Sequence, residues 1–156
     1  MKQHLISLVL FFSFLLSGCM PLKQTEVTSP NGHIRLAFAL DGNNRMTYQV
    51  SVGDTVCITS SLLGFTAKDG VNLAEGFKVI NTDFTTHDET WTQPWGENKN
   101  IRNHYNEMAV HLSDTTNTKL TLRFRIFDDG LGFRYEYEVP GADSILVTDE
   151  LTAFNI

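Results

Sequence analysis

Large apolar residues recur at every second position over most of the chain after Glu26. The clearest early example is "HIRLAFAL", residues 33–40, in which Ile34, Leu36 and Phe38 alternate with smaller or polar side chains. Alternation of this kind is typical of a β-strand with one buried face. The dipeptide Asn31-Gly32 stands just before it and favours a tight hairpin turn. The pattern therefore predicts a strand entered from a hairpin.

Two further strands are predicted downstream by the same alternation. The segment "RMTYQVSV" at 45–52 follows the turn sequence "DGNN", and "TVCITS" at 55–60 follows the turn Gly53-Asp54. Together these runs predict a meander of short antiparallel strands. Cys57 lies between two β-branched residues of the last run, so we expect a small buried side chain rather than a nucleophile.

The second half of the chain shows a longer hairpin pattern. Residues 120–126, "LTLRFRI", and residues 131–139, "LGFRYEYEV", alternate on either side of the turn that begins at Asp128. The charged residues of these runs fall on one face, where we expect cross-strand ion pairs. They are Arg123, Arg125, Arg134, Glu136 and Glu138.

The alternation continues into the last residues, "ILVTDELTAFNI" at 145–156. We expect a strand that is interrupted at Ile156, and hence a domain that is incomplete at its C-terminus. No segment has a convincing helical period. The predicted fold class is therefore all-β, an antiparallel β-sandwich.

The pattern of residues 1–19 is typical of a targeting segment. Lys2 precedes the apolar run at 5–16, and "LSGC" at 16–19 resembles a bacterial lipobox. We predict a lipoprotein signal peptide at 1–19, lipidation of Cys19, a linker at 20–28 and the folded domain at 29–156. This arrangement would tether the protein to the cell envelope, at the outer membrane facing the periplasm. An ordinary secretory leader or an uncleaved anchor are the alternatives.

Charge and cysteine content narrow the function further. The formal net charge is -6 and basic residues do not cluster, which argues against a nucleic-acid partner. If Cys19 carries lipid, Cys57 is the single remaining thiol of the 2 cysteines. We therefore expect no internal disulfide.

One run, "WTQPWGENKNIRNHYNE" from Trp91 to Glu107, has a different character. Aromatic rings stack on sugar rings, while amide, guanidinium and carboxylate groups bind hydroxyls. The candidate residues for carbohydrate binding are Trp91, Trp95, Glu97, Arg102, Asn103 and Tyr105. The same residues could alternatively form an interface with another domain, or the run could be a loop that closes the core of the sandwich.

The sequence provides little support for a catalytic site or a metal site. Glycoside hydrolysis requires two carboxyl groups held roughly 5 to 9.5 Å apart. Glu97 and Glu107 are the only candidate pair. We expect no catalytic residue in this chain. His87, His104 and His111 lack the close spacing of metal ligands, so we expect no metal site.

Four motifs in order, followed by the segment "TDELTAFNI", carry a resemblance to a known family. The motifs "SPNGHIRLAFALDGNNRMTYQVS", "LGF" at Leu63, "WTQPWGENKNIRNHYNEMAV" and "LRFRIFDDGLGFRYEYEVP" resemble the N-terminal domain of glycoside hydrolase family 97. The family comprises bacterial α-glucosidases and α-galactosidases, and the resemblance covers essentially 29–156. It implies a β-super-sandwich of the galactose-mutarotase-like type, followed in the family by a (β/α)8 barrel and a C-terminal β-domain.

The resemblance also implies where the chemistry of the family resides. The barrel carries the catalytic carboxylates, and a calcium ion at the cleft is held largely by glutamates. This chain shows no barrel, so we transfer no catalytic or calcium residue to it and expect no cofactor in this chain.

The resulting prediction is a carbohydrate-binding or scaffold domain of a family 97 enzyme that acts on α-glucosides or α-galactosides and is inactive alone. The alternatives are a stand-alone carbohydrate-binding envelope lipoprotein and a non-functional gene fragment.

Overall fold

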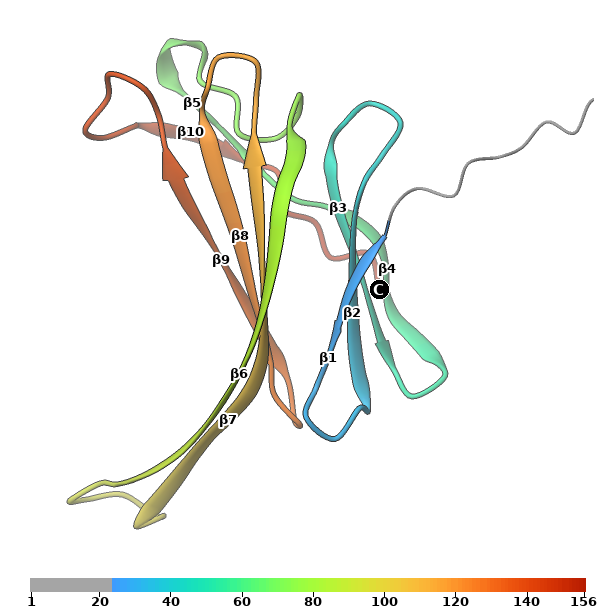
Figure 1. Cartoon of the computed structure of the whole chain (residues 1–156), viewed down its shortest axis with the longest axis vertical. Helices are drawn as coiled ribbons and strands as arrows, with labels where there is room; N and C mark the ends of the chain where they lie inside the picture. Colours follow the sequence, from blue (N-terminus) through green and yellow to red (C-terminus); the bar gives the residue numbers. More distant parts are fainter. Residues whose placement is uncertain (1–23) are drawn as a thin grey trace, which may run out of the picture.

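The computed structural model describes residues 24–156, which fold into two facing antiparallel sheets (Figure 1). The first sheet has the order β1-β2-β3-β4, formed by Thr25–Thr28, Ile34–Leu40, Met46–Val52 and Thr55–Leu62. The second has the order β6-β7-β8-β9, formed by Lys78–Thr92, Asn100–Ser113, Lys119–Ile126 and Leu131–Glu138. A small third sheet pairs β5, Phe65–Ala67, with β10, Val147–Glu150, and η1 is a short 3-10 turn at Lys68–Gly70. The predicted all-β antiparallel sandwich is confirmed.

Tight turns join the strands of the first sheet where the sequence predicts them. Gly32 has a φ of 74° between β1 and β2, and Gly53 has a φ of 56° between β3 and β4. Glycine adopts these left-handed conformations without steric cost because it has no Cβ. The β1 strand, however, lies inside the segment 20–28 that we predicted to be a linker. Four residues are too few for a period to be recognised in the sequence.

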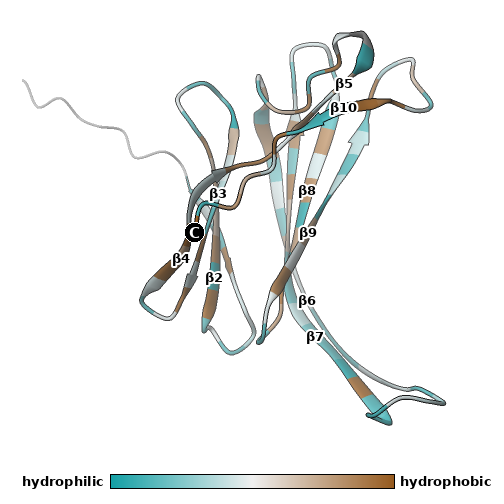
Figure 2. Cartoon of the chain, turned by 180° about the vertical axis from the view of Figure 1, so that it is seen from behind, coloured by the Kyte–Doolittle hydropathy of each residue, from teal (hydrophilic) through white to brown (hydrophobic). Residues whose placement is uncertain are grey.

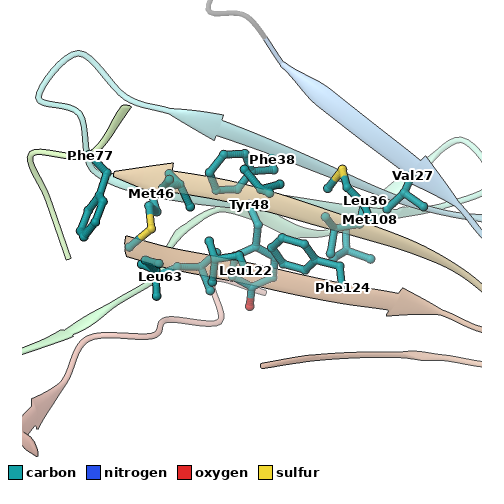
Figure 3. Close-up of a cluster of buried hydrophobic side chains, with 14 of the residues drawn as sticks. Val27, Leu36, Phe38, Met46, Tyr48, Leu63, Phe77, Met108, Leu122 and Phe124 are labelled. Atoms are coloured by element: carbon teal, nitrogen blue, oxygen red, sulfur yellow. The ribbon is translucent and has the colours of Figure 1, made fainter. Parts of the chain in front are cut away.

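The core lies between the two sheets (Figure 3). Leu36, Phe38 and Tyr48 of the first sheet face Leu122 and Phe124 of the second, and all five side chains are at most 2% exposed. The rings of Phe38 and Phe124 lie 6.2 Å apart across the interface. Each such side chain contributes roughly 1.5–3 kcal/mol by its burial. Leu36 and Phe38 are among the residues that the period-two pattern placed on one face of their strand.

The two sheets are also tied together at their turns. The backbone N–H of Asn31, in the β1–β2 turn, donates to Oδ1 of Asp128, in the β8–β9 turn, over 2.8 Å. In addition, the hydroxyl of Tyr135 in β9 accepts the N–H of Gly64 over 2.9 Å and contacts the Thr152 hydroxyl at 2.6 Å. Hydrogen bonds between distant segments thus fix the packing of the sandwich.

Cys57 is exposed, and the prediction that it is buried is wrong. It belongs to β4, which lies at the edge of the first sheet and has most of its side chains in solvent. Alternation along a single strand does not reveal whether a second layer covers that strand.

The last residues follow the free edge of β4. The Thr59 N–H donates to the Asn155 carbonyl over 2.8 Å, and the Ala153 N–H donates to the Leu62 carbonyl over 2.9 Å. The strand predicted at 145–156 is therefore the short β10 followed by an extended segment. No helix within residues 24–156 is long and apolar enough to span a bilayer. The predicted signal peptide and Cys19 lie outside the described residues.

Candidate functional site

The β6–β7 hairpin extends well beyond the sandwich (Figure 1). Pairing between β7 and β8 stops at Asn106 and Ile126, whereas pairing between β6 and β7 continues to Thr92 and Asn100. We call residues 87–105 the arm. It contains both tryptophans of the chain, and in Figure 2 most of it is hydrophilic. The run from Trp91 to Glu107 is thus part of a β-hairpin with a turn at 93–99.

The root of the arm is held on one face by Tyr105. Its ring stacks on His87 with the centroids 5.1 Å apart, and it lies 5.2 Å from the ring of Phe127. The Arg125 guanidinium sits over the same ring, with Cζ 4.6 Å from the centroid, in cation–π geometry. Tyr105 is consequently only 7% exposed. Its ring is covered and fixes the arm instead of presenting a surface to a ligand.

The opposite face of the root is held by Asn106. Its Nδ2 donates to the Thr28 carbonyl of β1 over 2.9 Å, and its Oδ1 accepts the Thr86 hydroxyl over 2.8 Å. Adjacent residues of a strand point to opposite faces. Tyr105 and Asn106 therefore clamp the arm from two sides.

The strand register separates the predicted site residues. The pairs Trp91–Ile101, Glu89–Asn103 and His87–Tyr105 lie on one face, since directly opposed residues share a face. We call this the outer face, because it continues the sheet surface that carries Arg125. The pairs Thr90–Arg102 and Asp88–His104 lie on the opposite, inner face.

The six candidates consequently do not form one cluster. Trp91, Asn103 and Tyr105 belong to the outer face, and Arg102 belongs to the inner face. The remaining two, Trp95 and Glu97, lie in the turn of the arm.

Near the tip of the outer face, Trp91 is 49% exposed beside a small polar cluster. Asn103 Nδ2 donates to Glu89 Oε1 over 3.2 Å, and His87 Nε2 lies 3.1 Å from the same oxygen. The hydrogen bonds from His87 and Asn103 lower the pKa of Glu89. Glu89 is therefore an ionised hydrogen-bond acceptor at neutral pH. Sequence reasoning did not select Glu89 or His87, because only the register places them beside Trp91.

On the inner face, Arg102 is engaged by Asp88. Its Nε and Nη2 donate to the two carboxylate oxygens of Asp88 over 2.8 and 2.7 Å. Hydrogen bonding to Arg102 lowers the pKa of Asp88, and the same contact raises the pKa of Arg102. Both side chains are exposed, so water screens the pair and it contributes little stability.

The turn of the arm depends on Gly96. The Gln93 side chain folds across the turn, and its Nε2 donates to the Asn98 carbonyl over 2.7 Å. Gly96 has a φ of 127°, and a Cβ at this position would lie 2.4 Å from Gln93 Nε2. Trp95 is 84% exposed beside it. Since both tryptophans are exposed, the interpretation that this run closes the sandwich core is wrong.

At the base of the arm, the outer face of the sheet carries an ion-pair network. Glu107 accepts hydrogen bonds from Arg123 Nη1 over 2.5 Å and Arg125 Nε over 2.7 Å. Arg123 also donates to both oxygens of Glu136, over 2.9 and 3.0 Å. The predicted cross-strand pairing of the charged residues is thus present, with Glu107 as an additional member.

These contacts determine the charge state of both glutamates. Burial acts to raise the pKa of Glu107, but the hydrogen bonds from Arg125 and Arg123 lower it overall. The hydrogen bond from Arg123 lowers the pKa of Glu136 to about 2. At about 3.3 Å per residue, the seven steps along the strand from Asn100 to Glu107 span about 23 Å. Glu97 lies beyond Asn100, in the turn, so Glu97 and Glu107 are too far apart to act as a hydrolytic pair.

The calcium ion implied for the full-length family finds no matching ligand set here. Within residues 24–156, no group of three or more His, Cys, Asp or Glu side chains is placed to hold a metal ion. The least exposed carboxylate, Glu107, is instead neutralised by arginines.

The sequence of this chain matches a known protein family. The family profile described as Glycosyl-hydrolase 97 N-terminal matches residues 27–156. A retaining alpha-galactosidase of Bacteroides thetaiotaomicron is 26% identical over 113 residues, which are 72% of this chain and 16% of that protein. The chain belongs to the glycoside hydrolase family 97 N-terminal domains.

Solved structures agree with this assignment. A family 97 enzyme of Pseudoalteromonas sp. strain K8, in an E480Q form bound to panose, matches with a TM-score of 0.78 and 31% identity over 83% of this chain. A beta-arabinopyranosidase matches with a TM-score of 0.76 and 25% identity, again over 83% of this chain. The chain spans 20% and 21% of those two proteins, about one fifth of each.

Proposed function

We propose that this chain is a carbohydrate-binding and scaffold domain of a family 97 glycoside hydrolase that acts on α-glucosides or α-galactosides. Cleavage of the glycosidic bond would belong to a catalytic barrel. The observation that carries the proposal is the arm, which presents Trp91 and Trp95 away from the sandwich, at 49% and 84% exposure. Large exposed aromatic side chains are characteristic of surfaces that bind sugars or other protein domains.

Exposed apolar residues on β6 support the scaffold part of the proposal. Ile80 and Phe84 are 68% and 55% exposed. A groove of about 660 Å³ separates the first sheet from this end of β6, and its lining includes Phe38 and Leu40. Apolar side chains at the edge of a sheet provide a contact surface for another domain.

The relatives support the carbohydrate part. One is an alpha-galactosidase, and the Pseudoalteromonas enzyme has been solved in complex with panose and with acarbose. At the rim of a cleft between sandwich and barrel, a single arm could contact both the barrel and its sugar. The seam and sugar interpretations of the arm are therefore compatible.

Assembly with a barrel tests the scaffold role. We would mix this protein with the catalytic barrel of a family 97 enzyme expressed without its own N-terminal domain, and measure association by analytical ultracentrifugation. We expect a one-to-one complex that is weakened by Trp95→Ala. If both partners are folded and no complex forms, the scaffold role is wrong.

Sugar binding by the protein alone tests the remaining part. Calorimetric titration with maltooligosaccharides and α-galactosides should give saturable binding to the folded protein. Binding without any association with a barrel would favour a stand-alone carbohydrate-binding lipoprotein. An insoluble product would favour a non-functional gene fragment.

We also propose that lipid on Cys19 anchors the protein to the outer membrane, facing the periplasm. The lipobox-like "LSGC" at 16–19 supports this localisation. Cys19→Ser should move the protein from the membrane fraction to an unprocessed or soluble form and abolish incorporation of labelled palmitate. A parent protein that incorporates no palmitate would contradict the proposal.

A further inference from the structure

We infer that the outer face of the arm, formed by Trp91, Glu89 and Asn103, is a saccharide-binding platform, and that the inner face is not part of it. The inference rests on the proposed function, because it names the part of the arm that would bind the sugar. It is carried by the register of the hairpin, which places one ring and two polar side chains together on a single face.

The spacing of these groups suits one sugar ring. Trp91 and Glu89 are two residues apart on β6, which corresponds to about 6.6 Å along a strand, and Asn103 lies directly opposite Glu89. A pyranose stacked on the indole would place its edge hydroxyls over the Glu89–Asn103 pair. The carboxylate accepts hydrogen bonds, while the amide both donates and accepts them. Such a pair can bind two neighbouring hydroxyls.

Glu89 has capacity left for a ligand. Its contacts with Asn103 and His87 both end on Oε1. Among the described residues, its Oε2 has no hydrogen-bond partner in the structure. The side chain is 54% exposed, so a hydroxyl can reach it from solvent. An ionised acceptor forms stronger hydrogen bonds to hydroxyls than a neutral one.

The platform is also preorganised. His87 is stacked on Tyr105, and Tyr105 is covered by Arg125 and Phe127, so the cluster is attached to the sandwich through fixed rings. Side chains that are already ordered lose less entropy when a ligand binds.

The inner face lacks these properties. Its positions from 86 to 92 and from 100 to 106 hold no Phe, Tyr or Trp, so a sugar ring has no indole or phenyl face to stack on. Arg102 is already engaged by both oxygens of Asp88. The two neighbouring carboxylates Asp88 and Glu89 therefore differ in face and in availability, which makes them a matched pair for an experiment.

Tryptophan fluorescence gives a selective readout, because both tryptophans of the chain lie in the arm. In a Trp95→Phe background, Trp91 is the only remaining tryptophan. We would titrate this protein with maltotriose, an α-glucoside, and with melibiose, an α-galactoside. We expect a saturable change in Trp91 emission with at least one of the two sugars.

Variants in the same background then test the assignment of the faces. Glu89→Gln should weaken binding about tenfold, because it replaces a charged hydrogen-bond acceptor with a neutral one. Asp88→Asn, one residue away on the inner face, should change the affinity less than twofold. Circular dichroism of each variant verifies that it is folded.

Three results would overturn the inference. One is equal weakening by Asp88→Asn and Glu89→Gln. The second is a response of Trp95 alone, measured in a Trp91→Phe protein, which would place the sugar at the turn. The third is no fluorescence response in any folded protein. If the protein still assembled with a barrel in that last case, the scaffold part of the proposed function would stand while the platform would not.

Discussion

The sandwich and the arm are built from the same β7 strand but are stabilised by different forces. At the sandwich end, Met108 and Val110 of β7 are fully buried between two sheets. At the arm end, the strand pairs only with β6 and has no second layer (Figure 1). An isolated two-stranded hairpin is marginally stable in water. The comparison teaches that the shape of the arm depends on the contacts at its root.

A large difference in stability between core and arm substitutions is the first expectation. Leu122 is fully buried, and Leu122→Ala should lower the free energy of unfolding by about 2–5 kcal/mol, through lost burial and the cavity left behind. Trp95→Ala removes a larger side chain that is 84% exposed, and should leave global stability unchanged. Urea denaturation followed by circular dichroism measures both. Comparable losses would mean that the arm packs on the sandwich in solution.

Substitution of one glycine in the sandwich and one in the arm compares the two regions at the level of the backbone. A Cβ on Gly64, where φ is 131°, would lie 2.5 Å from the Ala74 Cα. Gly64→Ala should therefore destabilise the protein by about 1–3 kcal/mol or more, because backbone must move and the conformation is strained.

Gly96 is the matched position in the arm. There the clash is with the movable end of the Gln93 side chain. Gly96→Ala should leave the thermal midpoint nearly unchanged but shift the emission of the neighbouring Trp95. An equal loss of stability in the two variants would contradict the separation of sandwich from arm.

The third expectation concerns pH. Glu136 has its pKa lowered from 4.5 to about 2 by Arg123, and Glu107 is lowered in the same direction. A lowered folded-state pKa contributes stability above the unfolded pKa, and this stability is lost as the pH falls through the folded one. Stability should therefore decline between about pH 4.5 and about pH 2.

Two substitutions test whether the ion-pair network on the sheet causes this loss of stability at low pH. Glu136→Gln should reduce the pH dependence and lower stability at pH 7 by about 1 kcal/mol, a value discounted for partial exposure. Asp88→Asn breaks the solvent-exposed pair of the arm and should have no measurable effect on stability. Urea midpoints at pH 7 and pH 3 decide between them. An unchanged pH profile in Glu136→Gln would place the acid-sensitive group elsewhere.

Most of the sandwich could be predicted from the sequence, because its strands have one buried and one exposed face. The segments 33–40 and 120–126 coincide with β2 and β8 to within one residue at each end. The prediction that Cys57 is buried was wrong because the tertiary structure, and not the local sequence, decides whether a second layer covers a strand. β6 was missed because most of its side chains are exposed on both faces, which leaves no alternation to recognise.

The candidate site shows the same division. The aromatic and polar run was identified, but Arg102 and Trp91 were grouped although the register places them on opposite faces. Glu89 was overlooked because its role as a candidate ligand depends on Asn103, which lies opposite it only in the folded hairpin. Local sequence gives the chemistry of such a run, and only strand pairing gives its geometry.

The smallest expected effect concerns the root of the arm. Asn106→Ala removes the hydrogen bond from Nδ2 to the Thr28 carbonyl of β1. One hydrogen bond is worth about 1 kcal/mol, so the global free energy of unfolding should fall by no more than that. Because the arm has few other contacts with the sandwich, its amide protons at 88–103 should nevertheless exchange faster.

Hydrogen exchange measured by mass spectrometry separates these two effects. Thr86→Ala, which loses only the contact with Asn106 Oδ1, is the control and should accelerate exchange less. Unchanged exchange in Asn106→Ala would mean that the packing of Tyr105 with Arg125 and Phe127 holds the arm by itself. In that case Tyr105→Ala should accelerate exchange in the arm, because it removes the ring that His87, Phe127 and Arg125 all contact. If neither variant changed the exchange, pairing between β6 and β7 would be sufficient to order the arm, and the dependence on its root would be wrong.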